Sequence, residues 1–97
     1  MSGYKLSRKA QREVADIICY LHREVGASVA DNIERRLFRA FADLAGGRAL
    51  GHPRTVLAKK NVLFYTASPY VVIYRTTNTS VYVLRVIHGS RDLKRLL

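Results

Sequence analysis

The spacing of apolar residues changes once along this chain of 97 residues, and that change limits the folds open to it. Up to Leu44, apolar residues recur three or four positions apart, which is the spacing of one face of a helix. From Asn61 onward they form short runs rich in β-branched and aromatic residues, which is typical of strands. The sequence therefore predicts an α+β fold with two helices ahead of most of the strands.

The first half of the chain predicts a short strand and two amphipathic helices. The strand is expected at Gly3–Leu6, and Ser7 then caps the first helix with its side-chain oxygen. One apolar stripe runs along each helix: Ala10, Val14, Ile17, Ile18, Leu21 and Val25 on the first, and Ala30, Ile33, Leu37, Ala40, Phe41 and Leu44 on the second.

Short connections decide how the two helices meet. Gly26 is expected to end the first helix and Ser28 to cap the second, so the link "GAS" is very short. Gly46 and Gly47 are expected to end the second helix. A link of this length predicts an antiparallel helical hairpin.

Three strand-like runs follow a loop rich in glycine and proline: "NVLFYT", "YVVIYR" and "VYVLRVI". The short joints "ASP" and "TTNTS" predict an antiparallel meander. We expect one domain over residues 1–97, with the order β-α-α-β-β-β. Its antiparallel sheet is packed on one face by the helical hairpin, and the other face has no helical cover.

Alternation along the last strand sorts its side chains into two sets. Tyr82, Leu84 and Val86 are expected on one face, and Val81, Val83, Arg85 and Ile87 on the other. A buried guanidinium without a partner is costly. The Arg85 face should therefore be open, or it should supply a carboxylate, and Arg75 on the neighbouring strand is expected nearby.

Charge is distributed unevenly around a net value of +10. Residues 1–43 hold eight Lys and Arg against six Asp and Glu, whereas residues 44–97 hold nine against one. Such a field favours a polyanionic partner, either nucleic acid or an acidic protein segment. The alternative is a solvated basic surface without a partner.

Three further features of the sequence exclude kinds of site and of segment. Cys19 is the one cysteine, so no internal disulfide or Cys-based zinc cluster is possible, and its helical setting predicts a small buried side chain. His22 and His52 lack neighbours at metal-ligand spacing, and we expect no metal and no cofactor. The polar start predicts no signal peptide or membrane segment, hence a cytoplasmic protein with no membrane partner.

The segments "LGHPR", "PYVVIYR" and "VYVLRVIHGSRDL", set behind a strand and a helical hairpin, carry a resemblance to a known family. Together they resemble the ParE branch of the RelE/ParE superfamily, the toxins of bacterial type II toxin-antitoxin modules. The resemblance covers nearly the whole chain. Its most specific part is "RVIHGSRD", where family members commonly show an arginine, a hydrophobic pair and then His-Gly-small-Arg-Asp.

The resemblance implies a toxin that inhibits DNA gyrase and that a cognate antitoxin neutralises in a hetero-oligomer. It implies that the antitoxin has a DNA-binding N-terminal part and a C-terminal tail, often acidic, that wraps the toxin. The alternative within the superfamily is a RelE-like, ribosome-dependent mRNA endonuclease. Such nucleases usually place a Tyr or His in the last few residues, whereas this chain ends in "LKRLL", so we expect no catalytic residue.

The candidate residues for binding an antitoxin or a target are mostly basic: Arg54, Lys59, Lys60, Arg75, Arg85, His88, Arg91 and Asp92. The first three form a basic loop that either touches an anion or is merely solvated, and both interpretations stay open. His88 at a strand end has the ordinary alternative of a structural hydrogen-bonding role. Arg91 and Asp92 have the alternative of a local ion pair.

Two further groups are given a structural interpretation. Arg35, Arg36 and Arg39 lie on one side of the second helix and are interpreted as a solvated face, with acidic residues within one turn. The tyrosines Tyr65, Tyr70, Tyr74 and Tyr82 are interpreted as packing residues with one wet end. If they were exposed on a basic face, the third hypothesis, a non-enzymatic RNA-binding module, would gain support.

Overall fold

The computed structural model describes residues 3–53 and 62–89. The elements in chain order are β1 (Gly3–Leu6), α1 (Arg8–Glu24), α2 (Ala27–Ala45), β2 (Leu63–Ala67), β3 (Tyr70–Thr76) and β4 (Ser80–His88). The predicted order β-α-α-β-β-β is confirmed.

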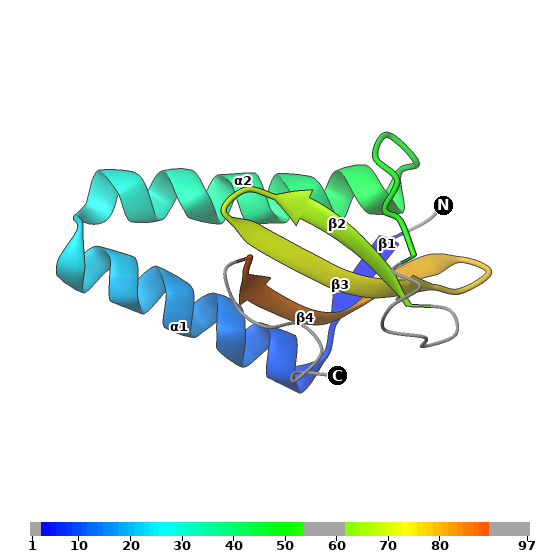
Figure 1. Cartoon of the computed structure of the whole chain (residues 1–97), viewed down its shortest axis with the longest axis horizontal. Helices are drawn as coiled ribbons and strands as arrows, with labels where there is room; N and C mark the ends of the chain where they lie inside the picture. Colours follow the sequence, from blue (N-terminus) through cyan, green and yellow to red (C-terminus); the bar gives the residue numbers. More distant parts are fainter. Residues whose placement is uncertain (1–2, 54–61, 90–97) are drawn as a thin grey trace.

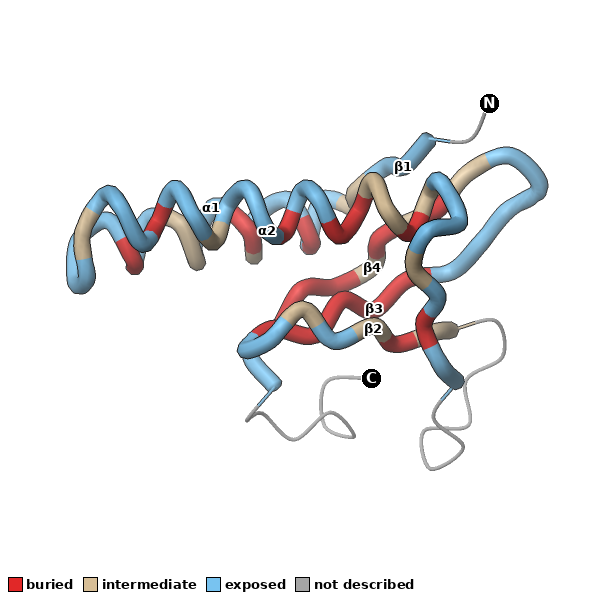
Figure 2. The backbone as a smooth tube through the Cα atoms, turned by 90° about the horizontal axis from the view of Figure 1, so that it is seen from above, coloured by how far each residue is buried: buried red, intermediate tan, exposed pale blue. Residues whose placement is uncertain are grey.

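The strands form one sheet in the order β1-β4-β3-β2. β2 pairs with β3 and β3 with β4 in antiparallel fashion, as the meander predicts. β1 pairs with β4 in parallel fashion, and the long connection that parallel pairing needs runs through both helices, β2 and β3, so the sheet is mixed. Figures 1 and 2 show α1 and α2 side by side as a layer on one face of this sheet.

Backbone geometry explains where the helices begin and end. The Ser7 Oγ accepts a hydrogen bond from the Ala10 N–H at 3.0 Å, so the predicted cap is confirmed. The expectation for Ser28 is wrong: α2 starts at Ala27, and Gly26 is its N-cap without any side-chain bond. Gly26 has φ 128° and ψ 161°, a conformation nearly reserved for glycine, which allows the reversal within so few residues.

The main core lies between the helices and the sheet, as the buried residues in Figure 2 show. The two apolar stripes supply Ala10, Val14, Leu37, Phe41 and Leu44, and the sheet supplies Tyr70, Val72, Tyr74, Val81, Val83 and Val86. Val25, at the end of its stripe, is 56% exposed. Cys19 is exposed rather than buried, so the prediction of a core cysteine is wrong.

A register shift corrects the predicted alternation of β4. Ile73 pairs with Arg85, but Tyr74 pairs with Val83, so Leu84 is an extra residue in β4. After this bulge the faces exchange. Val86 joins Val81 and Val83 in the main core, contrary to the expected grouping of Val86 with Tyr82 and Leu84.

The sheet face away from the hairpin carries no helix among the described residues, yet its centre is buried. Phe64, Val71, Ile73 and Ile87 form a second apolar cluster there, each at most 4% exposed. The face is thus apolar at its centre, rather than an open charged surface. In the described part of the chain, neither helix is long and apolar enough to cross a membrane.

Candidate functional site

The end of β4 is held by side chains from α1. The backbone N–H of Ser7 donates to the Val83 carbonyl at 2.9 Å, and there β1 ends as a partner of β4. Beyond that point the Ser7 Oγ donates to the Leu84 carbonyl at 2.8 Å, and the Val86 N–H donates to Glu13 Oε1 at 2.9 Å. Beyond the end of β1, the side chains of Ser7 and Glu13 therefore bond the backbone groups of β4 that a neighbouring strand would otherwise bond.

Glu13 is also the carboxylate partner that Arg85 requires. The Arg85 Nε and Nη2 both donate to Glu13 Oε2, at 2.9 Å and 2.7 Å. The Arg85 side chain is 10% exposed and that of Glu13 is 19% exposed. Of the two expected alternatives for Arg85, an open face or a carboxylate partner, the structure shows the carboxylate partner, and the guanidinium is largely buried.

His88 lies at the C-terminal end of β4, beside an aromatic ring. Its imidazole meets Tyr70 edge to face, with ring centroids 5.6 Å apart. Burial raises the pKa of the Tyr70 hydroxyl, and the nearby Tyr20 raises it further. Glu13, Asp16 and Ile17 of α1 line a hollow of about 330 Å³ next to this pair. His88 is thus an exposed residue with an aromatic packing contact.

Arg75 lies at the opposite end of the sheet. Its guanidinium carbon is 5.2 Å from the centroid of the Tyr82 ring, its cross-strand neighbour. From Tyr82 to His88, β4 advances by roughly 20 Å at about 3.3 Å per residue. Arg75, Arg85 and His88 therefore occupy separate positions and do not converge on one cavity.

The remaining predicted site residues, Arg54, Lys59, Lys60, Arg91 and Asp92, lie outside the described residues. Within residues 3–53 and 62–89, no group of three His, Cys, Asp or Glu side chains is arranged to hold a metal ion. The tyrosines match their interpretation as packing residues: Tyr70 and Tyr74 are buried, and Tyr65 and Tyr82 are half-buried.

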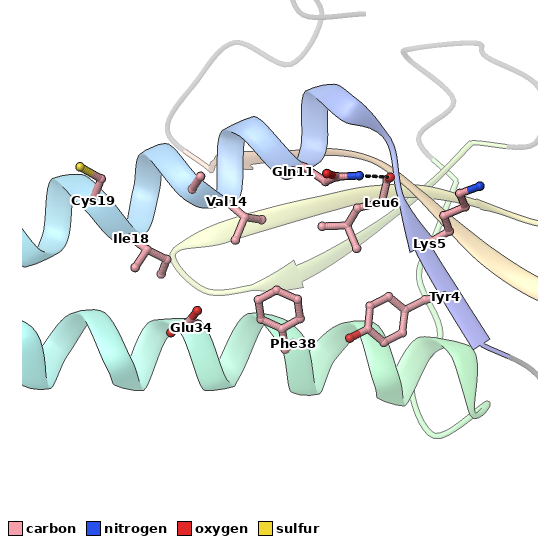
Figure 3. Close-up of a pocket in the computed structure, with 10 residues that line it drawn as sticks. Tyr4, Lys5, Leu6, Gln11, Val14, Ile18, Cys19, Glu34 and Phe38 are labelled. Carbon is pink, nitrogen blue, oxygen red and sulfur yellow. Dashed lines mark hydrogen bonds between the residues drawn. The ribbon is translucent and has the colours of Figure 1, made fainter.

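An apolar groove on the helical layer, which sequence reasoning missed, lies between β1 and the two helices (Figure 3). We call it the hairpin groove. It measures about 620 Å³ and is lined from three elements by Tyr4, Lys5 and Leu6 of β1, Gln11, Val14, Ala15, Ile18 and Cys19 of α1, and Glu34 and Phe38 of α2.

Two aromatic rings form the floor of the hairpin groove near β1. Tyr4 and Phe38 are each 37% exposed, and both rings lie against the buried Phe41, at centroid distances of 5.5 Å and 5.4 Å. Gln11 Nε2 donates to the Leu6 carbonyl at 3.1 Å at the other side of the groove (Figure 3). The sequence does contain a signal for this second apolar surface on α2, because Phe38 is an apolar residue that lies outside the stripe, next to Leu37.

The model of the family described as the ParE toxin of the type II toxin-antitoxin system parDE matches residues 4–93. A solved structure of a chromosomal ParDE toxin-antitoxin system from P. aeruginosa is similar, with a TM-score of 0.75 at 18% identity. That alignment covers 91% of this chain and 96% of the other.

A second solved structure, the toxin-antitoxin complex RelBE2 from Mycobacterium tuberculosis, is similar with a TM-score of 0.59 at 19% identity. That alignment covers 89% of this chain and 95% of the other. A search of curated proteins gave no match. The structural similarities establish a shared fold, and the family match includes the helical hairpin, β2, β3, β4 and all of β1 except Gly3.

Proposed function

The chain belongs to the family of ParE toxins of type II toxin-antitoxin systems, and from this premise we propose that it inhibits DNA gyrase and is neutralised by a cognate antitoxin. The observation that carries the proposal is the family match over residues 4–93. The similar P. aeruginosa and M. tuberculosis structures both come from toxin-antitoxin pairs, which supports an antitoxin partner in a hetero-oligomer.

The proposed mode of action is binding rather than bond cleavage. Its support is the arrangement at β4, where Arg85 is engaged by Glu13, and Arg75 and His88 lie at opposite ends of the sheet. General acid-base catalysis on RNA needs a proton acceptor, a proton donor and cations converging on one phosphate. The described residues do not form such a group. In this proposal the chain acts by binding to its target.

We place the antitoxin on the hairpin groove. An amphipathic helix laid in this groove would bury the exposed faces of Tyr4, Phe38 and Ile18. A basic chain of net charge +10 also favours an acidic partner through its overall field. Folding of an acidic amphipathic segment onto the groove then combines apolar burial with charge attraction.

A substitution in the groove tests this placement. Phe38→Asp is expected to weaken antitoxin binding at least tenfold, measured by calorimetric titration, because a carboxylate is desolvated against Tyr4 and Phe41. Val29→Asp is the matched control, since Val29 is 41% exposed on the same helix and lies outside the groove lining. Equal affinities of the two variants would mean that the antitoxin does not bind in the hairpin groove.

The target is tested with purified gyrase and a relaxed plasmid. The chain is expected to slow supercoiling or to accumulate cleaved DNA, and added antitoxin is expected to restore activity. A translation extract is run in parallel. Cleavage of messenger RNA on ribosomes with gyrase unaffected would contradict the proposal and assign the chain to the nuclease branch.

A further inference from the structure

A second hollow, of about 460 Å³, lies between α2 and the outer edge of β2. We call it the arginine cleft. Its lining residues are Arg35, Arg36, Arg39, Ala40 and Asp43 of α2 and Tyr65, Thr66, Ala67 and Ser68 at the end of β2. It does not share a lining residue with the hairpin groove. The two hollows are therefore separate features of the surface.

The cleft contains more positive charge than its own carboxylate can balance. Three arginines face one acidic residue, Asp43, whose Oδ1 lies 3.4 Å from Arg39 Nε and 3.0 Å from the Nε of Arg48. Two guanidinium groups thus share this carboxylate. Arg36 donates from Nη2 to the Ser68 carbonyl at 2.7 Å, and the side chain of Arg35 makes no hydrogen bond or ion pair within residues 3–53 and 62–89. The cleft consequently has excess positive charge with which an anion can pair.

The strand that borders the cleft has an open backbone position. β2 is at the edge of the sheet, and its Phe64 exchanges both backbone hydrogen bonds with His52, at 2.9 Å each. Backbone groups of a strand point outward at every second residue, so those of Thr66 also point away from β3. Thr66 is exposed, and within residues 3–53 and 62–89 neither its N–H nor its C=O has an outer partner. One donor and one acceptor are therefore available to an incoming chain.

An apolar hollow of about 310 Å³ continues from this position. Leu50, His52, Phe64, Tyr65 and Thr66 line it, so it shares Tyr65 and Thr66 with the arginine cleft. Leu50 is 76% exposed. A chain that crosses Thr66 therefore passes from a cationic surface to an apolar one.

From these contacts we infer that the arginine cleft binds an extended acidic peptide segment. Its carboxylates pair with Arg35 and Arg39, its backbone pairs with Thr66, and an apolar side chain follows beside Leu50. DNA fits less well, because its phosphodiester backbone carries no donor for the Thr66 carbonyl. The inference is independent of gyrase, since it concerns a peptide and a surface away from the hairpin groove.

Fluorescence anisotropy with the purified chain tests this site. The probe is a labelled peptide of about twelve residues, rich in Asp and Glu, with one leucine. Arg35→Glu/Arg39→Glu is expected to weaken binding at least tenfold. The control Arg8→Glu/Arg12→Glu makes the same charge change at exposed α1 positions outside the cleft, and a change below about threefold is expected. Equal losses in both double variants would mean that only net charge matters and would overturn the proposal.

A backbone variant separates strand pairing from charge. Thr66→Pro removes the outward N–H at an edge position that tolerates proline, and it is expected to weaken the peptide at least threefold. Thr66→Val keeps that N–H and is expected to bind as the natural chain does. Circular dichroism checks that both variants are folded. Equal binding by the two folded variants, or a duplex DNA that competes better than the peptide, would overturn the inference.

Discussion

Glu13 performs two tasks at the residue scale. Its two oxygens take different partners, Oε1 the backbone N–H of Val86 and Oε2 the guanidinium of Arg85. Both partners are on β4. One side chain of α1 therefore pairs with a buried cation and also accepts a hydrogen bond from a backbone N–H at the edge of the strand. The sequence predicted that Arg85 would either lie on an open face or meet a carboxylate, but not that a residue 72 positions earlier in the chain would provide that carboxylate.

Removal of this carboxylate is expected to be costly. Glu13→Ala should lower the free energy of unfolding by about 3 kcal/mol, because the largely buried Arg85 guanidinium loses the carboxylate that accepts two of its hydrogen bonds. Glu24→Ala is the control, since the Arg23–Glu24 pair is exposed, and a loss below about 1 kcal/mol is expected. Urea unfolding of both variants measures the difference. Equal losses would contradict the account of Arg85.

Tyr70 supplies a pH prediction. Burial, followed by Tyr20, raises the pKa of Tyr70 in the folded chain. Its contribution to stability is complete below the ordinary tyrosine value of about 10 and is lost as pH rises through the folded pKa. Urea unfolding of Tyr70→Phe between about pH 9 and 11 should therefore show a smaller loss of stability than the natural chain. Parallel losses would show that Tyr70 does not titrate with unfolding.

At the scale of elements, helices and strands were predictable because each has its own apolar period. The phase of β4 was not, because Leu84 inserts one residue opposite β3 and changes the face of every residue after it. The start of α2 was likewise misassigned to Ser28. Gly26 both allows the turn and is the N-cap, and a backbone role of this kind leaves little trace in residue type.

The turn between the helices can be tested with two glycines that differ in backbone conformation. A Cβ on Gly26 or on Gly3 would meet no atom within 4 Å, but only Gly26 has a positive φ among these two. Gly26→Ala is therefore expected to cost about 1–3 kcal/mol, and Gly3→Ala much less. Thermal or urea unfolding of the two variants gives the comparison. Similar stabilities would mean that the hairpin does not depend on the conformation of Gly26.

At the scale of the whole molecule, the helical layer carries a groove and a cleft on surfaces that the sequence did not distinguish. Net charge predicted an anionic partner, but a charge count does not locate a surface. Arg35 and Arg39 were interpreted as solvated, and they line a cleft because β2 lies beside α2. Much of the basic second half, including Arg54, Lys59 and Lys60, lies outside the described residues.

The most direct test of the central claim is the topology of a plasmid in bacteria that express this chain. Plasmid is extracted after induction, with and without the cognate antitoxin, and its linking number is read on a chloroquine gel. The account predicts that negative supercoiling falls or broken plasmid appears when the chain is expressed alone, and that the antitoxin prevents this. Arrested growth with plasmid topology unchanged would contradict it.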